Sequence, residues 1–94
     1  MALLDLLGRR WALRVLWELG HGNASSFHDL QARCGEISSS VLSKRLRELR
    51  EAEIVAVHRN GGYTLTKEGM RLLESLAPLD EWAKRWERRT SAGS

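Results

Sequence analysis

The fold of this chain is decided by the stretch SSSVLSKRLRELR, residues 38–50. Its three leading serines offer hydroxyls that accept hydrogen bonds from the unpaired amides of a first helical turn. Leu42, Leu46 and Leu49 follow at the i, i+4, i+7 spacing of one buried helical stripe. The other face carries hydroxyls and cations, on Ser39, Ser40, Ser43, Lys44, Arg47 and Arg50. Such a face suits a nucleic-acid groove, although taken alone a charged helix face is more often simply solvated.

The residues before this stretch predict a second, shorter helix. Phe27 and Leu30 begin it, over about residues 27–34, with Ser26 as the expected N-cap. A tight connection at 35–37, which begins with glycine, joins it to the helix at 38–50. Two short helices joined in this way are typical of a helix-turn-helix, whose second helix enters the major groove of DNA.

The residues after the stretch predict a small hairpin. β-Branched residues at 54–57 and the run Tyr-Thr-Leu at 63–65 are separated by a turn that contains Asn60-Gly61. An Asn-Gly step between two β-prone runs is a strong hairpin signal. The expected fold is therefore mainly α with a small two-stranded β-hairpin, a winged helix-turn-helix. Arg59, at the hairpin tip, would reach a phosphate or a minor groove.

Apolar residues cover an unusually wide arc of the N-terminal segment. Residues 3–19 predict one long helix, weakened near Gly8. It is expected to end at residues 20–23, with Gly20 as a left-handed cap. A helix that is apolar on so much of its circumference needs cover on two sides. One side would pack on this domain and the other on a second copy.

The C-terminal segment carries a second apolar stripe, with charged residues on its opposite face. Thr66 is expected to cap its helix, and Pro78 is expected to kink or break it near Ala77. Large apolar residues continue beyond Pro78. The two terminal segments together supply the predicted dimer interface, which consists of Leu4, Leu7, Trp11, Leu79, Trp82 and Trp86.

Composition narrows the class of protein. The 94 residues fit a single domain, expected over 1–89 with a disordered tail at 90–94. A hydrophobic fraction of 43% suffices for a core, and the net charge of +3 mildly favours an anionic partner. The single cysteine excludes an intramolecular disulfide and fits a reducing cytoplasm. No apolar run approaches the roughly 20 residues of a membrane span, and the first residues do not predict a signal peptide.

Other chemistry finds little support in the sequence. The three histidines, His21, His28 and His58, do not form a zinc pattern with Cys34, so no metal or cofactor is expected. Neither a catalytic constellation nor a glycine-rich phosphate loop is present, which argues against an enzyme. Cys34 is expected to be a buried small hydrophobe, with a thiol switch as the alternative. The tryptophans favour core and interface packing over a ligand pocket, and no residue set points to an effector.

Taken together, the chain resembles the bacterial winged-helix regulators of the HxlR type, which are related to the MarR regulators. The resemblance is carried, in the family's order, by residues 8–16, 27–30, 37–49, 54–55 and 63–69 and by the late tryptophans. It implies dimeric DNA binding, with the first and last helices building the dimer. Two features depart from the family: the short hairpin, and Ser26 where relatives often carry arginine. The chain also lacks the reactive cysteine that redox-sensing members place near the N-terminus.

The resulting prediction is a homodimeric, sequence-specific transcriptional regulator, cytoplasmic and associated with the nucleoid. Its two helices at 38–50 would read a palindromic operator in double-stranded DNA, with half-sites about 34–36 Å apart or a multiple of it. Lys44, Arg47 and Arg50 are assigned to phosphates or guanine, the serines to hydrogen bonds near the helix start, and Arg59 to a weaker contact. Arg45 is expected to brace Glu48 or Glu51. The alternative is a winged-helix module that binds another protein through its tryptophan-rich faces.

Overall fold

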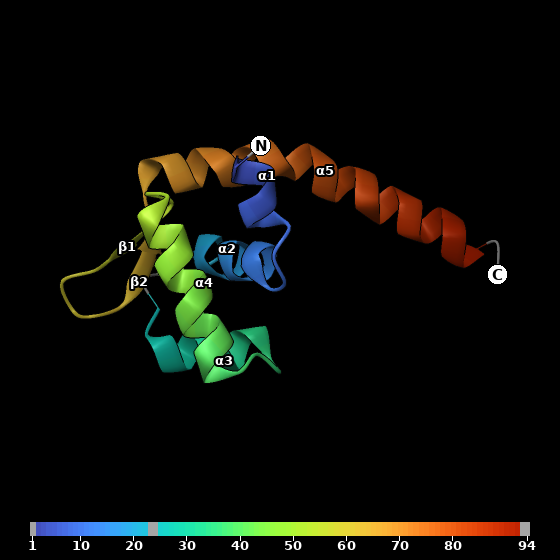
Figure 1. Ribbon diagram of the computed structural model, residues 1–94. Helices are drawn as coiled ribbons and strands as arrows, with labels where there is room; N and C mark the ends of the chain where they lie inside the picture. The colour runs from blue at the N-terminus through green and yellow to red at the C-terminus, as the bar shows by residue number, and fades with distance from the viewer. Residues whose placement is uncertain (1, 23–24, 93–94) are drawn as a thin grey trace.

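The computed structural model describes residues 2–22 and 25–92 of the chain. Five helices and one hairpin follow one another in the order of a winged helix-turn-helix (Figure 1). They are α1 (Ala2–Leu7), α2 (Ala12–Gly20), α3 (Phe27–Cys34), α4 (Ser39–Glu51), β1 (Val55–Val57), β2 (Tyr63–Leu65) and α5 (Lys67–Ala92). The predicted fold class is confirmed. Within the described residues, none of the helices is long and apolar enough to cross a membrane.

The core lies where α2, α3 and α4 meet beneath the first half of α5. Leu16, Leu30 and Leu42 are completely buried there. The stripe predicted on the fourth helix is confirmed, because Leu46 and Leu49 are buried beside Leu42. One face of α4 is thereby committed to the domain's own interior, and the opposite face is left to the surface.

The N-terminal segment forms two helices, so the prediction of one helix over 3–19 is wrong. The chain turns after Leu7, and Trp11 takes a left-handed backbone conformation with φ of 76° before α2 begins. Both α1 and α2 can then pack on the core. The predicted cap is also wrong, because Gly20 lies within α2 and a Cβ there would overlap the side chain of Leu73. Asn23, in the predicted turn, lies outside the described residues.

The hairpin has the predicted strands and is antiparallel, with Val55 paired to Leu65 and Val57 to Tyr63. Its turn places Gly61 at φ of 88°, a conformation that favours glycine. A short bridge adds Ser25 to the other edge of β2, because Ser25 and Tyr63 exchange backbone hydrogen bonds of 2.9 and 2.6 Å. The wing is therefore anchored both to the sequence before α3 and to the core.

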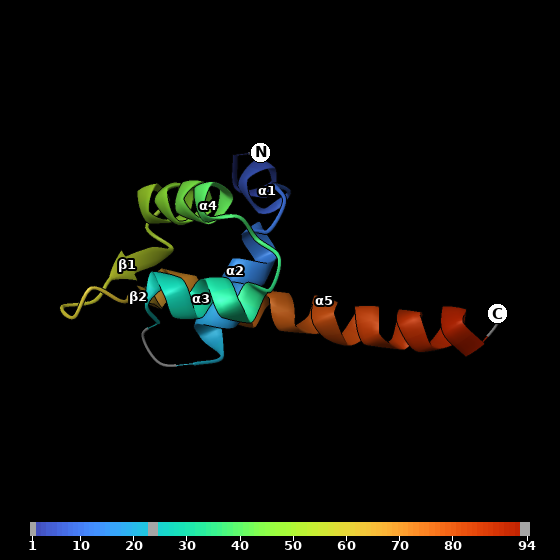
Figure 2. The ribbon, with the colours of Figure 1, turned by 90° about the horizontal axis from the view of Figure 1, so that it is seen from below.

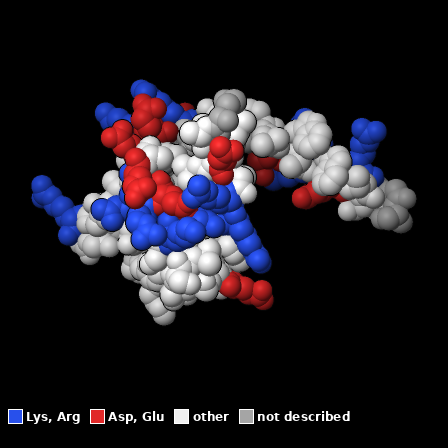
Figure 3. Space-filling view, in the orientation of Figure 1, with Lys and Arg blue, Asp and Glu red and all other residues white. Residues whose placement is uncertain are grey.

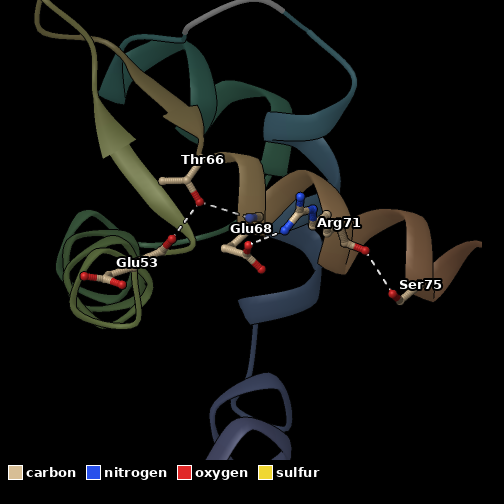
Figure 4. A network of polar contacts seen from close by, with 6 residues as sticks. Glu53, Thr66, Glu68, Arg71 and Ser75 are labelled. Carbon is tan, nitrogen blue, oxygen red and sulfur yellow. Dashed lines mark hydrogen bonds and ion pairs between the residues drawn. The ribbon is translucent and has the colours of Figure 1, made fainter.

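Thr66 joins the wing, the end of α4 and the start of α5 (Figure 4). Its hydroxyl donates to the carbonyl of Glu53 at 2.6 Å and accepts from the amide of Gly69 at 3.0 Å, which confirms it as the cap of α5. Its own amide donates to the carbonyl of Ile54 at 3.0 Å. A Cβ at Gly69 would overlap that carbonyl oxygen, so only glycine allows this close approach of α5 to the chain entering β1.

Helix α5 is continuous from Lys67 to Ala92, so of the kink or break predicted at Pro78, the break does not occur. Glu74 and Pro78 are both exposed, so water can solvate the carbonyl that the proline cannot bond. The ribbon changes direction near the middle of α5, and its second half extends away from the other elements (Figures 1 and 2). Residues 90–92, expected in a disordered tail, belong to this helix, and 93–94 lie outside the described residues.

Candidate nucleic-acid interface

Hydrogen bonds between the third and fourth helices fix the start of α4. Ser38 is its N-cap, and its hydroxyl accepts from the amide of Val41 at 3.2 Å. The Gln31 side chain, on α3, donates to the Ile37 carbonyl at 3.2 Å and to the Ser39 hydroxyl at 3.1 Å. These bonds span the connection between the two helices, so the first turn of α4 has a fixed orientation relative to α3.

The three serines predicted to contact DNA differ in the hydrogen bonds that their hydroxyls already form within the fold. Ser39 accepts from Gln31, and the Ser40 hydroxyl lies 3.3 Å from that of the capping Ser38. Ser43 is exposed one turn later, and within the described part of the chain its hydroxyl has no hydrogen-bond partner. The structure therefore places all three on the exposed side of α4 and leaves Ser43 the least committed.

The predicted cations Lys44, Arg47 and Arg50 are exposed along the same face. Among residues 2–22 and 25–92, none of these three forms an ion pair. Arg45 behaves differently, because its guanidinium lies 2.5 Å from a Glu48 carboxylate oxygen. The prediction that Arg45 braces a glutamate is confirmed.

A contact that the sequence did not predict joins α4 to the segment between α1 and α2. Arg9 forms an ion pair with Glu48, and Arg45 donates to the Arg10 carbonyl at 2.7 Å. The sequence does not signal this contact, because no local pattern indicates a pairing across so much of the chain. Figure 3 shows the result, a band of basic side chains across α4 and the segment beside it.

An open groove of about 500 Å³ separates the second half of α4 from the wing. It is lined by Arg47, Arg50, Glu51, Val55, Ala56 and Val57. Arg59 is exposed in the turn between the two strands, and a basic side chain projects from the hairpin tip in Figure 3. The wing thus presents one cation beyond this groove, which charged residues of α4 line on one side and apolar residues of β1 on the other.

Cys34 is buried at the end of α3. Burial raises the pKa of its thiol, the nearby Glu18 carboxylate raises it further, and Arg14 opposes them. A thiol held neutral and away from solvent is a poor nucleophile. Within the described residues, groups of three or more metal-ligating side chains are absent.

The residues predicted for the dimer interface fall into two groups. Leu7 is only 8% exposed and Trp11 is partly buried, and both pack on the domain's own core, so little of Leu7 remains for a partner. The break before Trp11 turns them inward. The others are exposed large apolar side chains in this chain: Leu4, Leu79, Trp82 and Trp86.

Two features of the second half of α5 accompany this exposed apolar surface. The rings of Trp82 and Trp86 stack with their centroids 6.2 Å apart. A groove of about 180 Å³ lies between α2 and α5. Its lining residues are mainly apolar: Leu13, Trp17, Leu73, Leu76, Leu79, Asp80 and Ala83.

Comparisons with known proteins agree with this geometry. A family model described as HxlR-like helix-turn-helix matches residues 6–91. The chain is 29% identical over 89 residues to an uncharacterized HTH-type transcriptional regulator, YvaP, from Bacillus subtilis, covering 88% of this chain and 82% of that protein.

Solved structures with the same fold are also regulators by name. One is a possible HxlR family transcriptional factor from Thermoplasma volcanium, with a TM-score of 0.85, 30% identity and coverage of 94% of this chain and 84% of that one. Another is a putative MarR family transcriptional regulator from Enterococcus faecalis, with a TM-score of 0.81, 27% identity and coverage of 95% and 86%.

The chain belongs to the HxlR-like helix-turn-helix family, because the family model matches most of its length. The resemblance inferred from the sequence, including its relation to MarR regulators, is confirmed. The members and relatives named above are transcriptional regulators rather than enzymes. The winged helix-turn-helix described here is therefore the fold of a family of transcriptional regulators.

Proposed function

We propose that this protein is a sequence-specific DNA-binding transcriptional regulator that acts as a homodimer, with α4 in the major groove of a palindromic operator. One observation carries the proposal. Helix α4 buries its leucine stripe completely and turns Lys44, Arg47 and Arg50 outward, where no carboxylate among the described residues pairs with them. Unpaired cations on a rigid, solvent-facing helix are suited to a polyanion.

The dimensions of α4 fit this role. A helix with its side chains is about 10–12 Å across, and the major groove of B-DNA is about 12 Å wide. In that groove the arginines would reach phosphates or the acceptor edge of guanine, and Ser43 would hydrogen-bond to a base edge near the helix start. The wing would place Arg59 on the adjacent backbone or minor groove.

The dimer is supported by the apolar surface of α5. Leu79, Trp82 and Trp86 are each more than half exposed in the single chain, and apolar side chains clustered in this way mark interaction surfaces. A second copy would cover them and place two α4 helices about 34–36 Å apart, or a multiple of it. Sedimentation at low micromolar concentration tests this. A monomer at all concentrations would remove the dimer and leave DNA binding to be tested separately.

The DNA-binding proposal is tested by selection from random duplexes, followed by fluorescence anisotropy over a range of salt concentrations. Arg47→Ala should weaken binding to the selected duplex about tenfold, and a lost phosphate contact would lower the salt slope by about one. Arg88→Ala, on the exposed end of α5, is the matched control. Equal binding by wild type and Arg47→Ala at every salt concentration would contradict the proposal and favour a protein-binding module.

A regulator bound to DNA would be found with the nucleoid in the cytoplasm. A fluorescent fusion of the full chain should therefore overlap with a DNA stain. The Arg47→Ala fusion should overlap with it less, because nonspecific DNA binding rests on the same phosphate contacts. Equal, diffuse fluorescence of both fusions would count against this localisation.

A further inference from the structure

The segment between α1 and α2, residues 8–11, is held directly against α4. The Arg10 carbonyl accepts a hydrogen bond of 2.7 Å from Arg45, and Arg9 pairs with Glu48. Arg45 also pairs with Glu48, and the side chains of Arg45 and Glu48 are only 13% and 12% exposed. The segment and the middle of α4 therefore form one polar assembly, in which Arg45 and Glu48 are mostly shielded from solvent and Arg9 and Arg10 are exposed.

This assembly has more positive than negative charge. Glu48 is the one carboxylate that it contains, and it faces the guanidinium groups of both Arg9 and Arg45. The Arg10 guanidinium lies 5.8 Å from the centre of the Trp11 ring, and in the described part of the chain it has no carboxylate partner. An exposed guanidinium is thus displayed on a segment whose backbone is fixed.

The carboxylates of α2 and α3 are already paired, and Asp5, on α1, forms no ion pair with Arg10 among the described residues. Glu18 pairs with Arg14 at 3.1 Å and Asp29 with Arg33 at 3.2 Å. They therefore do not offset the charge of Arg10.

The segment lies on the side of α4 that faces away from the wing. Arg45 and Glu48 touch residues 8–11, whereas Arg50 lines the groove toward β1. Arg47 lines the same groove, and Lys44 is exposed on the same helix. When a helix fills a major groove about 12 Å wide, its two flanks meet the two phosphate backbones that border the groove. The wing would meet one backbone, and the segment at 8–11 would meet the other.

We propose that Arg10 contacts a backbone phosphate on the side of the major groove opposite the wing, from a segment positioned by Arg45 and Glu48. This inference rests on the proposed insertion of α4 into the groove. The contact positions the domain on the duplex and carries no base specificity, because phosphates are the same at every step. It adds one cation to those expected from the recognition helix and the wing.

The test uses the full chain, the duplex obtained by selection and a random-sequence duplex of the same length. Arg10→Ala keeps the carbonyl that holds Arg45, so the fold should be retained. It should weaken binding to both duplexes by about three- to tenfold, lower the salt slope by about one and leave the preferred sequence unchanged. Arg10→Lys should bind nearly as well as wild type, and Arg10→Glu should bind worse than Arg10→Ala.

Arg88→Ala is the control for loss of one exposed arginine far from α4. If Arg10→Ala has the same affinity and salt slope as Arg88→Ala while Arg47→Ala is weaker, the Arg10 contact is overturned and the proposed function stands. If the wild type binds neither duplex, the proposed function fails as well. The expected order of affinity is wild type and Arg10→Lys, then Arg10→Ala, then Arg10→Glu. Any other order overturns the inference, even if one variant is unstable.

Discussion

Helix α4 and the second half of α5 both carry a regular apolar stripe, yet the fold treats the two stripes in opposite ways. Leu42 and Leu49 on α4 are 0% exposed, whereas Trp82 and Trp86 on α5 are 53% and 52% exposed. The outward face of α4 is polar and cationic. The stripe on α5 is itself an outward face, on a helix that extends beyond the domain (Figure 1).

The difference shows that periodicity identifies an apolar face without identifying what covers it. On α4 the covering elements are α2, α3 and the wing of the same chain. On the second half of α5, the described part of the chain supplies no such cover. Among the described residues, Lys44, Arg47 and Arg50 on α4 therefore have no carboxylate partner. In the same part of the chain, Trp82 and Trp86 on α5 have no apolar surface that covers them.

The largest effect is expected at the covered stripe. Leu42→Ala leaves a cavity in the core and should lower the free energy of unfolding by about 3 kcal/mol. Urea unfolding followed by circular dichroism, at a fixed protomer concentration, measures this loss. Ser43→Ala, the neighbouring exposed position, should change stability by less than about 0.5 kcal/mol. Equal effects at the two positions would mean that α4 does not bury this stripe.

At the exposed stripe the loss should appear in association instead. Trp82→Ala should weaken the homodimer by about 2 kcal/mol, or about thirtyfold in Kd, as is typical of an aromatic interface anchor. Sedimentation over a concentration series measures the change, with Arg88→Ala as the control on the same helix. If Trp82→Ala leaves the dimer intact, another surface forms it, and the contrast between the two helices loses its meaning.

Ion pairs sharpen the same contrast. Glu48→Ala removes the carboxylate shared by Arg9 and Arg45 and should destabilise the fold by about 1–2 kcal/mol, because the Arg45 side chain is left mostly buried without its partner. On α5, the Lys84 ammonium lies 3.2 Å from the Asp80 carboxylate. Lys84→Ala removes this exposed ion pair and should lower the free energy of unfolding by less than about 0.5 kcal/mol. Urea denaturation of both variants provides the comparison. Similar losses would show that the Glu48 pairing contributes no more than a surface pair.

The smallest expected effect is on the pH dependence of stability and concerns Cys34. Burial raises the pKa of its thiol, whereas the second half of α5 is mostly exposed. The folded state disfavours the thiolate, so this stabilisation is complete below the ordinary thiol pKa of 9.0 and is lost as pH rises through the higher folded value. The stability difference between wild type and Cys34→Ala should therefore shift against the wild type between about pH 8 and about pH 10. All other groups are common to both proteins, so their contributions cancel in the difference. A difference that stays constant across this range would contradict the raised pKa.

The sequence predicted the central part of the fold well because its signals there are local. The Ser26 and Ser38 hydroxyls cap α3 and α4 by accepting hydrogen bonds of 3.0 and 3.2 Å from backbone amides of the first helical turn. The Asn60-Gly61 step lies in the hairpin turn, and Thr66 caps the last helix. Each of these hydrogen bonds joins residues no more than three positions apart, so the local sequence is enough to predict it.

The errors arose where distant residues decide the outcome. Trp11 takes a positive φ that few residues tolerate, as part of the turn that brings α1 back onto the core. Gly20 looked like a helix end, but its place in α2 is explained by the close approach of Leu73. For the candidate site, the exposed face of α4 was predicted correctly, whereas the link from Arg9 to Glu48 could not be, because it joins residues far apart in the sequence.

The close approach at Gly69 has a mechanical consequence. Its backbone lies against the Ile54 carbonyl without room for a side chain, and Thr66 is hydrogen-bonded on both sides of the same junction. This junction leaves little room for relative movement. The start of α5 and the base of the hairpin are therefore expected to move as one rigid unit.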